Sequence, residues 1–318
     1  MSMKKLDPYI AGMTWGWTGV RGTWGNGKAE KSMELMKQRL NVNWTAIAFG
    51  ALQEHPQSTE IPYWEAPTVT DDEVIWAIRK AKSMGLKVVL KPVVNVRNGT
   101  WRAHINFFDM DVPCEPKWSE WFAAYEAFIL HYAAIAEETG CELFCIGCEM
   151  VQTDRRELEW RELIAKVRNV YSGPITYNCD KYQEDHVKWW DAVDIISSSG
   201  YYPIAAWEEQ LDRIEAVVKH HGKQFFFMEA GVPSRTGSEH LPNDWGLQGS
   251  PDEEVQKRYY ETMFTSCDRR GWVSGFMLWD WPPRLYDLSD ASANDDYCMY
   301  GKQAESVIAQ YYTRKTSD

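Results

Sequence analysis

The sequence predicts a single (β/α)₈ barrel, an α/β fold in which eight parallel strands alternate with helices. Short β-branched or aromatic runs alternate with amphipathic segments along the whole chain. Several of these runs are apolar at every position, as expected of parallel strands that are buried on both faces. The length of 318 residues falls in the range of such barrels. We therefore expect residues 1–318 to form one domain, with a doubly wound open sheet as the alternative architecture.

Eight segments have the composition of strands. Val88-Val89-Leu90 and Phe225-Phe226-Phe227-Met228 are the clearest of the continuous apolar runs. In chain order, the expected strands are Ile10–Trp15, Trp44–Phe49, Lys87–Val93, Leu143–Cys148, Ile175–Asn178, Ile195–Ser198, Gln224–Met228 and Gly275–Trp279.

Every strand is expected to be followed by a helix, because apolar residues recur there at positions i, i+3 and i+4. Thr70 and the three acidic residues after it form a helix start, and Gly85, Gly140 and Gly222 mark helix ends. The expected helices are Glu30–Leu40, Asp71–Met84, Trp118–Glu138, Asp154–Val170, a short piece at Glu184–Ala192, Trp207–His221, Asp252–Arg270 and Lys302–Thr313.

Four long segments between these elements have the character of elaborated loops after strands. They are Gly50–Thr70, Val94–Lys117, Ala230–Ser250 and Asp280–Gly301. Loops that follow strands build the functional site of a (β/α)₈ barrel, so the site is expected among them.

Composition argues against several classes of partner. The net charge of −12 repels phosphate backbones and anionic lipids, so neither nucleic acid nor a membrane is expected as a partner. Met1–Pro8 has no apolar stretch of signal-peptide length, which predicts a cytoplasmic protein. Seven cysteines, an odd number, predict reduced thiols. The seven histidines are dispersed and none ends a strand, so we predict no metal and no cofactor.

Two glutamates terminate apolar strands, Glu149 on the fourth and Glu229 on the seventh. In a closed barrel these two strands lie on opposite sides of the mouth, so the carboxylates are expected to face each other. A pair about 5–5.5 Å apart supports double displacement at an anomeric carbon, in which one carboxylate attacks and the other protonates the leaving oxygen. Each glutamate alone is better explained as a buried, paired carboxylate; together they predict catalysis.

These residues resemble a known group of enzymes. The paired glutamates, Tyr201-Tyr202-Pro203 after the sixth strand and Trp279 after the eighth are similar to clan-A retaining glycoside hydrolases, and the chain over nearly its full length resembles glycoside hydrolase family 113, the β-1,4-mannanases. The resemblance implies that Glu149 is the acid/base and Glu229 the nucleophile. It also implies β-mannan or manno-oligosaccharides as the substrate.

One position departs from the clan pattern. The clan has Asn immediately before the acid/base, where its amide contacts the sugar 2-hydroxyl, whereas this chain has Cys148. Family 113 varies at this position, so the departure favours that family. The axial 2-hydroxyl of mannose then needs another partner, and Asn178 and Lys91 are the candidates.

Aromatic residues are the remaining candidates for substrate contact. A strand places one of Tyr201 and Tyr202 inside the mouth and the other outside, and we expect Tyr202 to steady Glu229. The chain has more tryptophans, 17, than phenylalanines, 11. Because the indole N–H is difficult to bury without a partner, about a third of these rings are expected to face a ligand. The candidates are Trp279 as a floor beneath the sugar and Trp15, Trp17, Trp24, Trp245 and Trp281 as platforms.

Three alternatives remain open. A retaining hydrolase of another β-glycan (glucan, xylan or galactan) would use the same carboxylates, and a barrel that only binds carbohydrate would need neither. The spacing Cys141-x₃-Cys145-x₂-Cys148 resembles the cluster motif of radical-SAM enzymes. We do not favour this interpretation, because Cys145 and Cys148 are expected to point to opposite faces of one strand.

Overall fold

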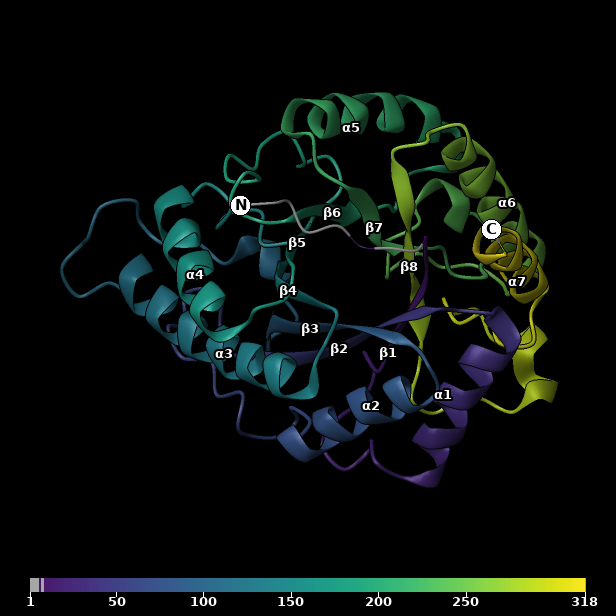
Figure 1. Ribbon diagram of the computed structural model, residues 1–318, viewed down its shortest axis with the longest axis horizontal. Coiled ribbons are helices and arrows are strands. Elements are labelled where there is room, and N and C mark those ends of the chain that lie inside the picture. The colour runs from purple at the N-terminus through teal and green to yellow at the C-terminus, as the bar shows by residue number, and fades with distance from the viewer. Residues whose placement is uncertain (1–5, 7–8, 318) are drawn as a thin grey trace.

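The computed structural model describes residues 6 and 9–317, and it forms a closed barrel with the helices outside it (Figure 1). Each of the eight strands in the described part of the chain pairs in parallel with the next, and β8 closes on β1. The (β/α)₈ prediction is therefore confirmed, and the open sheet is excluded. Most of Met1–Pro8, on which the expectation of no signal peptide rests, lies outside the described residues.

The strands agree with the prediction in number and order. Their bounds are β1 Ile10–Trp15, β2 Trp44–Gln53, β3 Lys87–Val96, β4 Leu143–Cys148, β5 Ile175–Cys179, β6 Ile195–Ser199, β7 Phe225–Ala230 and β8 Val273–Trp281. Strands β2 and β3 run further than expected because they pair residue by residue over their whole length, from Trp44 with Lys87 to Gln53 with Val96. Consequently the first residues of two expected loops are strand.

Seven helices cover the barrel in the described residues (Figure 1). They are α1 Gly27–Leu40, α2 Asp71–Ser83, α3 Trp118–Thr139, α4 Glu157–Val170, α5 Trp207–His221, α6 Glu253–Asp268 and α7 Gln303–Thr316. The expected helix at Glu184–Ala192 is wrong, because this segment is a series of turns. So short a helix is not stable by itself. Packing of Trp189 and Trp190 holds the segment instead, and their N–H groups donate to Asp154 O and Glu184 O.

The interior of the barrel is apolar along the first part of the strands and polar along the last part. Ile10, Trp44, Val89, Leu143 and Phe226 belong to the buried apolar cluster inside the barrel. Two residues beyond Val89, at the same phase of β3, the interior holds the fully buried Lys91. Such a change along one strand places charged groups at the carboxyl end of the barrel, where (β/α)₈ enzymes carry their sites.

Strand alternation is interrupted where the polar part begins. The register shifts between Cys145 and Cys148 in β4, and again between Phe227 and Ala230 in β7. A β-bulge adds one residue to a strand and changes which side chains point inward. As a result, Cys145 and Cys148 are both inside the barrel, and our expectation that they point to opposite faces is wrong.

No helix in the described part of the chain is long and apolar enough to cross a membrane.

Candidate active site

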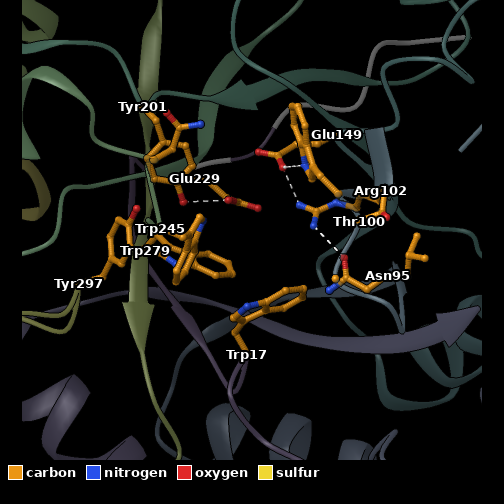
Figure 2. A pocket seen from close by; sticks show the side chains of 14 residues that line it. Trp17, Asn95, Thr100, Arg102, Glu149, Tyr201, Glu229, Trp245, Trp279 and Tyr297 are labelled. Atoms are coloured by element: carbon orange, nitrogen blue, oxygen red, sulfur yellow. Dashed lines mark hydrogen bonds and ion pairs between the residues drawn. The ribbon is translucent and has the colours of Figure 1, made fainter. Parts of the chain in front are cut away.

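A cavity of about 570 Å³ opens at the carboxyl ends of the strands (Figure 2). Its volume is in the range of small-molecule sites. Glu149 and Glu229 both line it, and Figure 2 shows their carboxylates pointing toward one another. The other lining residues are Trp17, Asn95, Val96, Gly99, Thr100, Trp101, Arg102, Tyr201, Asn243, Trp245, Trp279 and Tyr297.

Glu229 lies in β7 within the register shift that turns its side chain inward. Its Oε1 forms an ion pair with Lys91 Nζ and accepts a hydrogen bond from Cys148 Sγ at 3.3 Å. Its Oε2 accepts from the Tyr201 hydroxyl at 2.8 Å. Burial alone would raise the pKa of Glu229, but Lys91, Arg102 and the hydrogen bonds outweigh it and lower the pKa below its ordinary value. The arrangement therefore holds Glu229 ionised.

The charge of Lys91 is itself stabilised by the groups around it. Burial opposes its charge, but Cys148 and Glu229 outweigh burial and raise the pKa of Lys91 above its ordinary value. Its Nζ donates to Asn178 Oδ1 at 3.1 Å. Because Lys91 and Asn178 are fully buried and do not line the cavity, neither is placed to contact a sugar hydroxyl. The prediction that they meet the 2-hydroxyl is wrong; they support the carboxylates instead.

Glu149 directly follows β4, with a φ of 51°, in the left-handed region. Its Oε1 accepts from Ser199 Oγ at 2.6 Å. Its Oε2 accepts from Arg102 Nη2 at 2.6 Å and from Trp101 Nε1 at 3.3 Å. Glu149 thus has a cation and two neutral donors of its own, which differ from those of Glu229.

Arg102 contacts three residues of the site besides its neighbours in the chain: Glu149, Cys148 and Asn95. Its Nε donates to Cys148 O at 2.9 Å, its Nη1 to Asn95 Oδ1 at 3.1 Å, and its Nη2 also approaches Cys148 Sγ at 3.2 Å. The Cys148 thiol therefore lies between Arg102 and Glu229. A thiol that is both donor and acceptor occupies the position where the clan has an amide, and it contacts protein groups on both sides.

The walls of the cavity are aromatic. Trp17 and Trp279 meet edge to face with ring centroids 5.2 Å apart, and Trp245 and Tyr297 meet at 5.1 Å. Trp101 is 40% exposed and Trp245 is 67% exposed, so both rings can be reached from solvent. The indole N–H of Trp279 is buried and has no hydrogen-bond partner among the described residues. Trp17, Trp245 and Trp279 all line the cavity, and their contact with a sugar stays a prediction.

Three predicted platforms lie elsewhere. Trp15 and Trp281 are fully buried on the outer side of the barrel, and their N–H groups donate to Ser32 Oγ and to Ser32 O. Trp24 is also buried and packs on Trp15 at 5.0 Å. The prediction that these three rings contact substrate is wrong, because they pack between barrel and helices, where large rings contribute most to the core.

The preference for Tyr202 over Tyr201 is also wrong. Tyr202 is fully buried and its hydroxyl donates to Glu184 Oε1 at 2.8 Å. Tyr201 contacts Glu229 because it lies two residues beyond Ser199, which points inward to Glu149. In the sequence, alternation along Ser199-Gly200-Tyr201 already predicts that Ser199 and Tyr201 point to the same side of the sheet.

Sequence reasoning also missed Arg102, Ser199 and Trp101. Trp101 and Arg102 lie in the connection between β3 and α3, where Arg102 begins a short 3₁₀ helix, Arg102–His104. An element this short has no periodicity that predicts the direction of a side chain. Ser199 ends β6 as the last of three serines, and only its phase relative to Tyr201 marks it.

The described residues contain no group of three or more His, Cys, Asp or Glu side chains that could hold a metal ion. Cys141 lies near Thr139 and Cys145 donates to Gly147 O, so the three cysteines of the x₃/x₂ spacing do not converge. The cluster-ligating interpretation is therefore wrong.

Comparison with known proteins identifies the family. The model of Glycoside Hydrolase Family 113 matches residues 13–302. A solved GH113 β-1,4-mannanase is 56% identical with a TM-score of 0.95, covering 96% of this chain and 99% of its own. The GH113 β-mannanase AaManA from Alicyclobacillus acidocaldarius, solved with ManMIm, is 44% identical with a TM-score of 0.94, covering 97% and 98%.

More distant structures share only the fold. The β-glucuronidase of Ruminococcus gnavus is 17% identical with a TM-score of 0.64, covering 96% of this chain and 50% of its own. No curated protein matches the sequence. Since the family model spans most of the residues and the solved relatives align over nearly the whole chain, this chain belongs to Glycoside Hydrolase Family 113.

Proposed function

We propose that this chain, acting as a single catalytic domain over residues 1–318, hydrolyses β-1,4-mannosidic linkages in mannan or manno-oligosaccharides with retention of configuration. The observation that carries the proposal is that Glu149 and Glu229 face each other across one cavity, each with its own buried cation. Support for the substrate comes from the solved relatives, which are β-1,4-mannanases.

The first step breaks the glycosidic bond. Glu229 attacks the anomeric carbon as an ionised carboxylate, while Glu149 gives its proton to the leaving oxygen. The products are a covalent mannosyl ester on Glu229 and a free hydroxyl on the departing sugar. Lys91, Cys148 and Tyr201 favour this role for Glu229, since they hold it ionised and aimed into the cavity.

The second step releases the bound sugar. Glu149, now ionised beside Arg102, takes a proton from water as the water oxygen attacks the anomeric carbon. The ester bond to Glu229 breaks, the carboxylate is regenerated, and Glu149 is again protonated. Two inversions at the same carbon give overall retention.

Binding of the sugar chain depends on the aromatic walls. Trp279 lines the cavity beside the ion pair of Glu229, with Lys91 Nζ 5.7 Å from its ring centroid. Its flat ring lines the cavity and suits the face of a pyranose, which presents C–H groups. Trp17 and Trp245 also line the cavity and add to its apolar surface.

The test is product release from manno-, cello-, xylo- and galacto-oligosaccharides. We expect the wild-type protein to cleave only the manno-series and Glu229→Gln to cleave nothing. Glu54→Gln, a change at an exposed glutamate outside the cavity, is the matched control and should behave as wild type. Cleavage of another series would keep the two-carboxylate mechanism and replace the substrate. No cleavage of any series, with sugar binding retained, would replace hydrolysis by carbohydrate binding.

A cytoplasmic location, with imported oligosaccharides as the working substrate, is part of the same proposal. All seven cysteines are free thiols, as is usual in a reducing compartment. Fractionation of the producing cells, with an antibody against this chain, tests the location directly.

A further inference from the structure

Both peptide groups that flank Glu149 are tied to strand β5. The N–H of Glu149 donates to Asn178 O at 2.8 Å, on the side before its Cα. On the other side, the N–H of Met150 donates to the hydroxyl of Tyr177 at 2.9 Å. The first contact is between backbone groups and does not depend on the side chain at 178. The second is made by a side chain and so depends on the residue at 177.

The Tyr177 hydroxyl is oriented by a buried carboxylate. It donates its single proton to Asp154 Oδ1 at 2.5 Å, which leaves a lone pair for the N–H of Met150. Asp154 is only 4% exposed and lies in the turn that follows Glu149. Its own N–H donates back to Met150 O at 3.1 Å. The turn after Glu149 is thus closed into a ring of contacts that includes Tyr177.

Glu149 needs this support because of its backbone conformation. Its φ of 51° lies in the left-handed region, which costs a residue with a Cβ about 1–2 kcal/mol. A residue held there relaxes toward an ordinary φ when the contacts around it weaken. Rotation about this bond would swing the Glu149 side chain away from Ser199 and Arg102, and therefore away from the cavity.

We propose that Tyr177 is a positioning residue for Glu149: its hydroxyl, oriented by Asp154, fixes the peptide group after Glu149 and so aims that carboxylate at the leaving oxygen. The inference rests on the proposed function, because it assigns Glu149 the part of acid and base. Tyr177 does not line the cavity.

Substitution of Tyr177 by phenylalanine tests the contribution of the hydroxyl alone. The ring of Tyr177 packs against Trp160, Trp189 and Trp190, with centroids 5.3, 4.9 and 6.1 Å away. Tyr177→Phe keeps these ring contacts and removes only the two hydrogen bonds. The matched control is Tyr171→Phe. Tyr171 is also buried, lies just before β5 and does not line the cavity. Its hydroxyl donates to Cys141 O at 2.7 Å.

The experiment compares two substrates with different needs for acid catalysis. A manno-oligosaccharide requires a proton at its leaving oxygen, whereas 2,4-dinitrophenyl β-mannoside has a leaving group that departs without one. For Tyr177→Phe we expect kcat/KM to fall about tenfold or more on the oligosaccharide, and to stay within about threefold of wild type on the dinitrophenyl substrate. Tyr171→Phe should leave both values near wild type.

Two further measurements complete the test. Because Glu149 also activates water, kcat of Tyr177→Phe on the dinitrophenyl substrate should fall, and added azide should restore it. Asp154→Asn, which weakens the acceptor that orients the hydroxyl, should give the same substrate pattern with a smaller loss. It carries the test alone if Tyr177→Phe does not fold.

Equal losses on the two substrates, or the same pattern in Tyr171→Phe, overturn the role of Tyr177. A wild-type protein that cleaves neither mannoside overturns the proposed function instead, so the two failures are distinguishable.

Discussion

The surroundings of Glu229 and Glu149 differ in where their partners come from. Glu229 lies within β7 and is held by Lys91 of β3, Cys148 of β4 and Tyr201 just after β6. Glu149 lies just beyond β4 and is held by Ser199 of β6 together with Arg102 and Trp101 of a loop. One carboxylate is therefore fixed almost entirely by the barrel, and the other partly by a connection at the rim.

The difference suits two different tasks. A nucleophile needs a constant charge and a constant direction, which rigid strands and a buried lysine provide. An acid/base gains and loses a proton in every cycle, and its partners must tolerate both states. A serine hydroxyl can donate to the carboxylate or accept from the protonated acid, so Ser199 can stay hydrogen-bonded to Glu149 in both protonation states. The following predictions concern substitutions of the two carboxylates' surroundings, made separately for Glu149 and for Glu229.

Loss of the Glu149 carboxylate should have the largest effect. Glu149→Ala should lower kcat/KM on manno-oligosaccharides by about 10²–10⁴-fold, because general acid catalysis is lost. Azide, which needs no base, should restore turnover of 2,4-dinitrophenyl β-mannoside and give β-mannosyl azide, identified by its NMR coupling. An α-azide product would instead indicate that Glu149 is the nucleophile and would reverse the two roles.

Removal of the Lys91 charge should affect the Glu229 side. Lys91→Met leaves Glu229 buried without its cation, so we expect activity at pH 7 to fall about 100-fold and the free energy of unfolding to fall by about 3–5 kcal/mol. The lowered pKa of Glu229 stabilises the fold above the unfolded pKa, and this contribution is lost as the pH falls through the folded pKa.

The pH profile checks the sign of this prediction. In Lys91→Met the pKa of Glu229 rises, so the acidic limb of the kcat/KM profile should move to higher pH. Denaturant unfolding at several pH values should show that the wild-type protein loses its stability advantage over the variant as the pH falls. An acidic limb that does not move would mean that Lys91 does not hold Glu229 ionised.

The two tyrosines after β6 test how specific the Glu229 contacts are. Tyr201→Phe removes one donor to a carboxylate, a contact of about 1.5–3 kcal/mol, so we expect kcat/KM to fall about 10–100-fold and the acidic limb to move upward. Tyr202→Phe removes a contact with Glu184 and should lower thermal stability with little change in kcat/KM. A larger kinetic loss in the Tyr202 variant would contradict the assignment.

The sequence predicts the elements of this molecule better than the directions of its side chains. Seven of the eight expected helices and all the strands exist, because hydrophobic periodicity reports burial directly. The carboxylates are also predictable, since two ionisable groups at the ends of apolar strands are costly to bury unless they serve a site. Period-two reasoning fails at Cys148, where a bulge in β4 changes the phase without a mark in the sequence.

The loop residues show a second limit. Arg102 contacts both Cys148 and Glu149, yet it lies in an irregular connection whose path is set by tertiary packing. Likewise, composition alone could not separate Trp279, at the cavity, from Trp281 two residues later, which is buried against Ser32. Both are in β8, and strand alternation would place them on the same face. The register of β8 against β1 shifts between Leu278 and Trp281, so only Trp279 lines the cavity.

Among the direct partners of the two carboxylates, the smallest kinetic effect is expected on the Glu149 side, from the loss of one neutral donor. Ser199→Ala removes the hydrogen bond to Glu149 Oε1 and the one that Ser199 Oγ accepts from Asn178 Nδ2. It should lower kcat/KM on manno-oligosaccharides about tenfold or less, while the dinitrophenyl substrate is spared. The adjacent Ser198 is an internal control. It is fully buried on the same strand, and its hydroxyl has no partner among the described residues, so Ser198→Ala removes no hydrogen bond.

The pair of serines therefore separates two physical causes of any loss. If packing of β6 matters, both variants lose activity on both substrates, since each creates a void of the same size in the same strand. If the contact with Glu149 matters, only Ser199→Ala responds, and only on the substrate whose leaving oxygen needs a proton. Tyr201→Phe should show the opposite dependence, with losses on both substrates, because the Glu229 attack is common to them. A Ser199 variant that behaves like the Tyr201 variant would show that its loss also reaches Glu229, through Asn178 and Lys91.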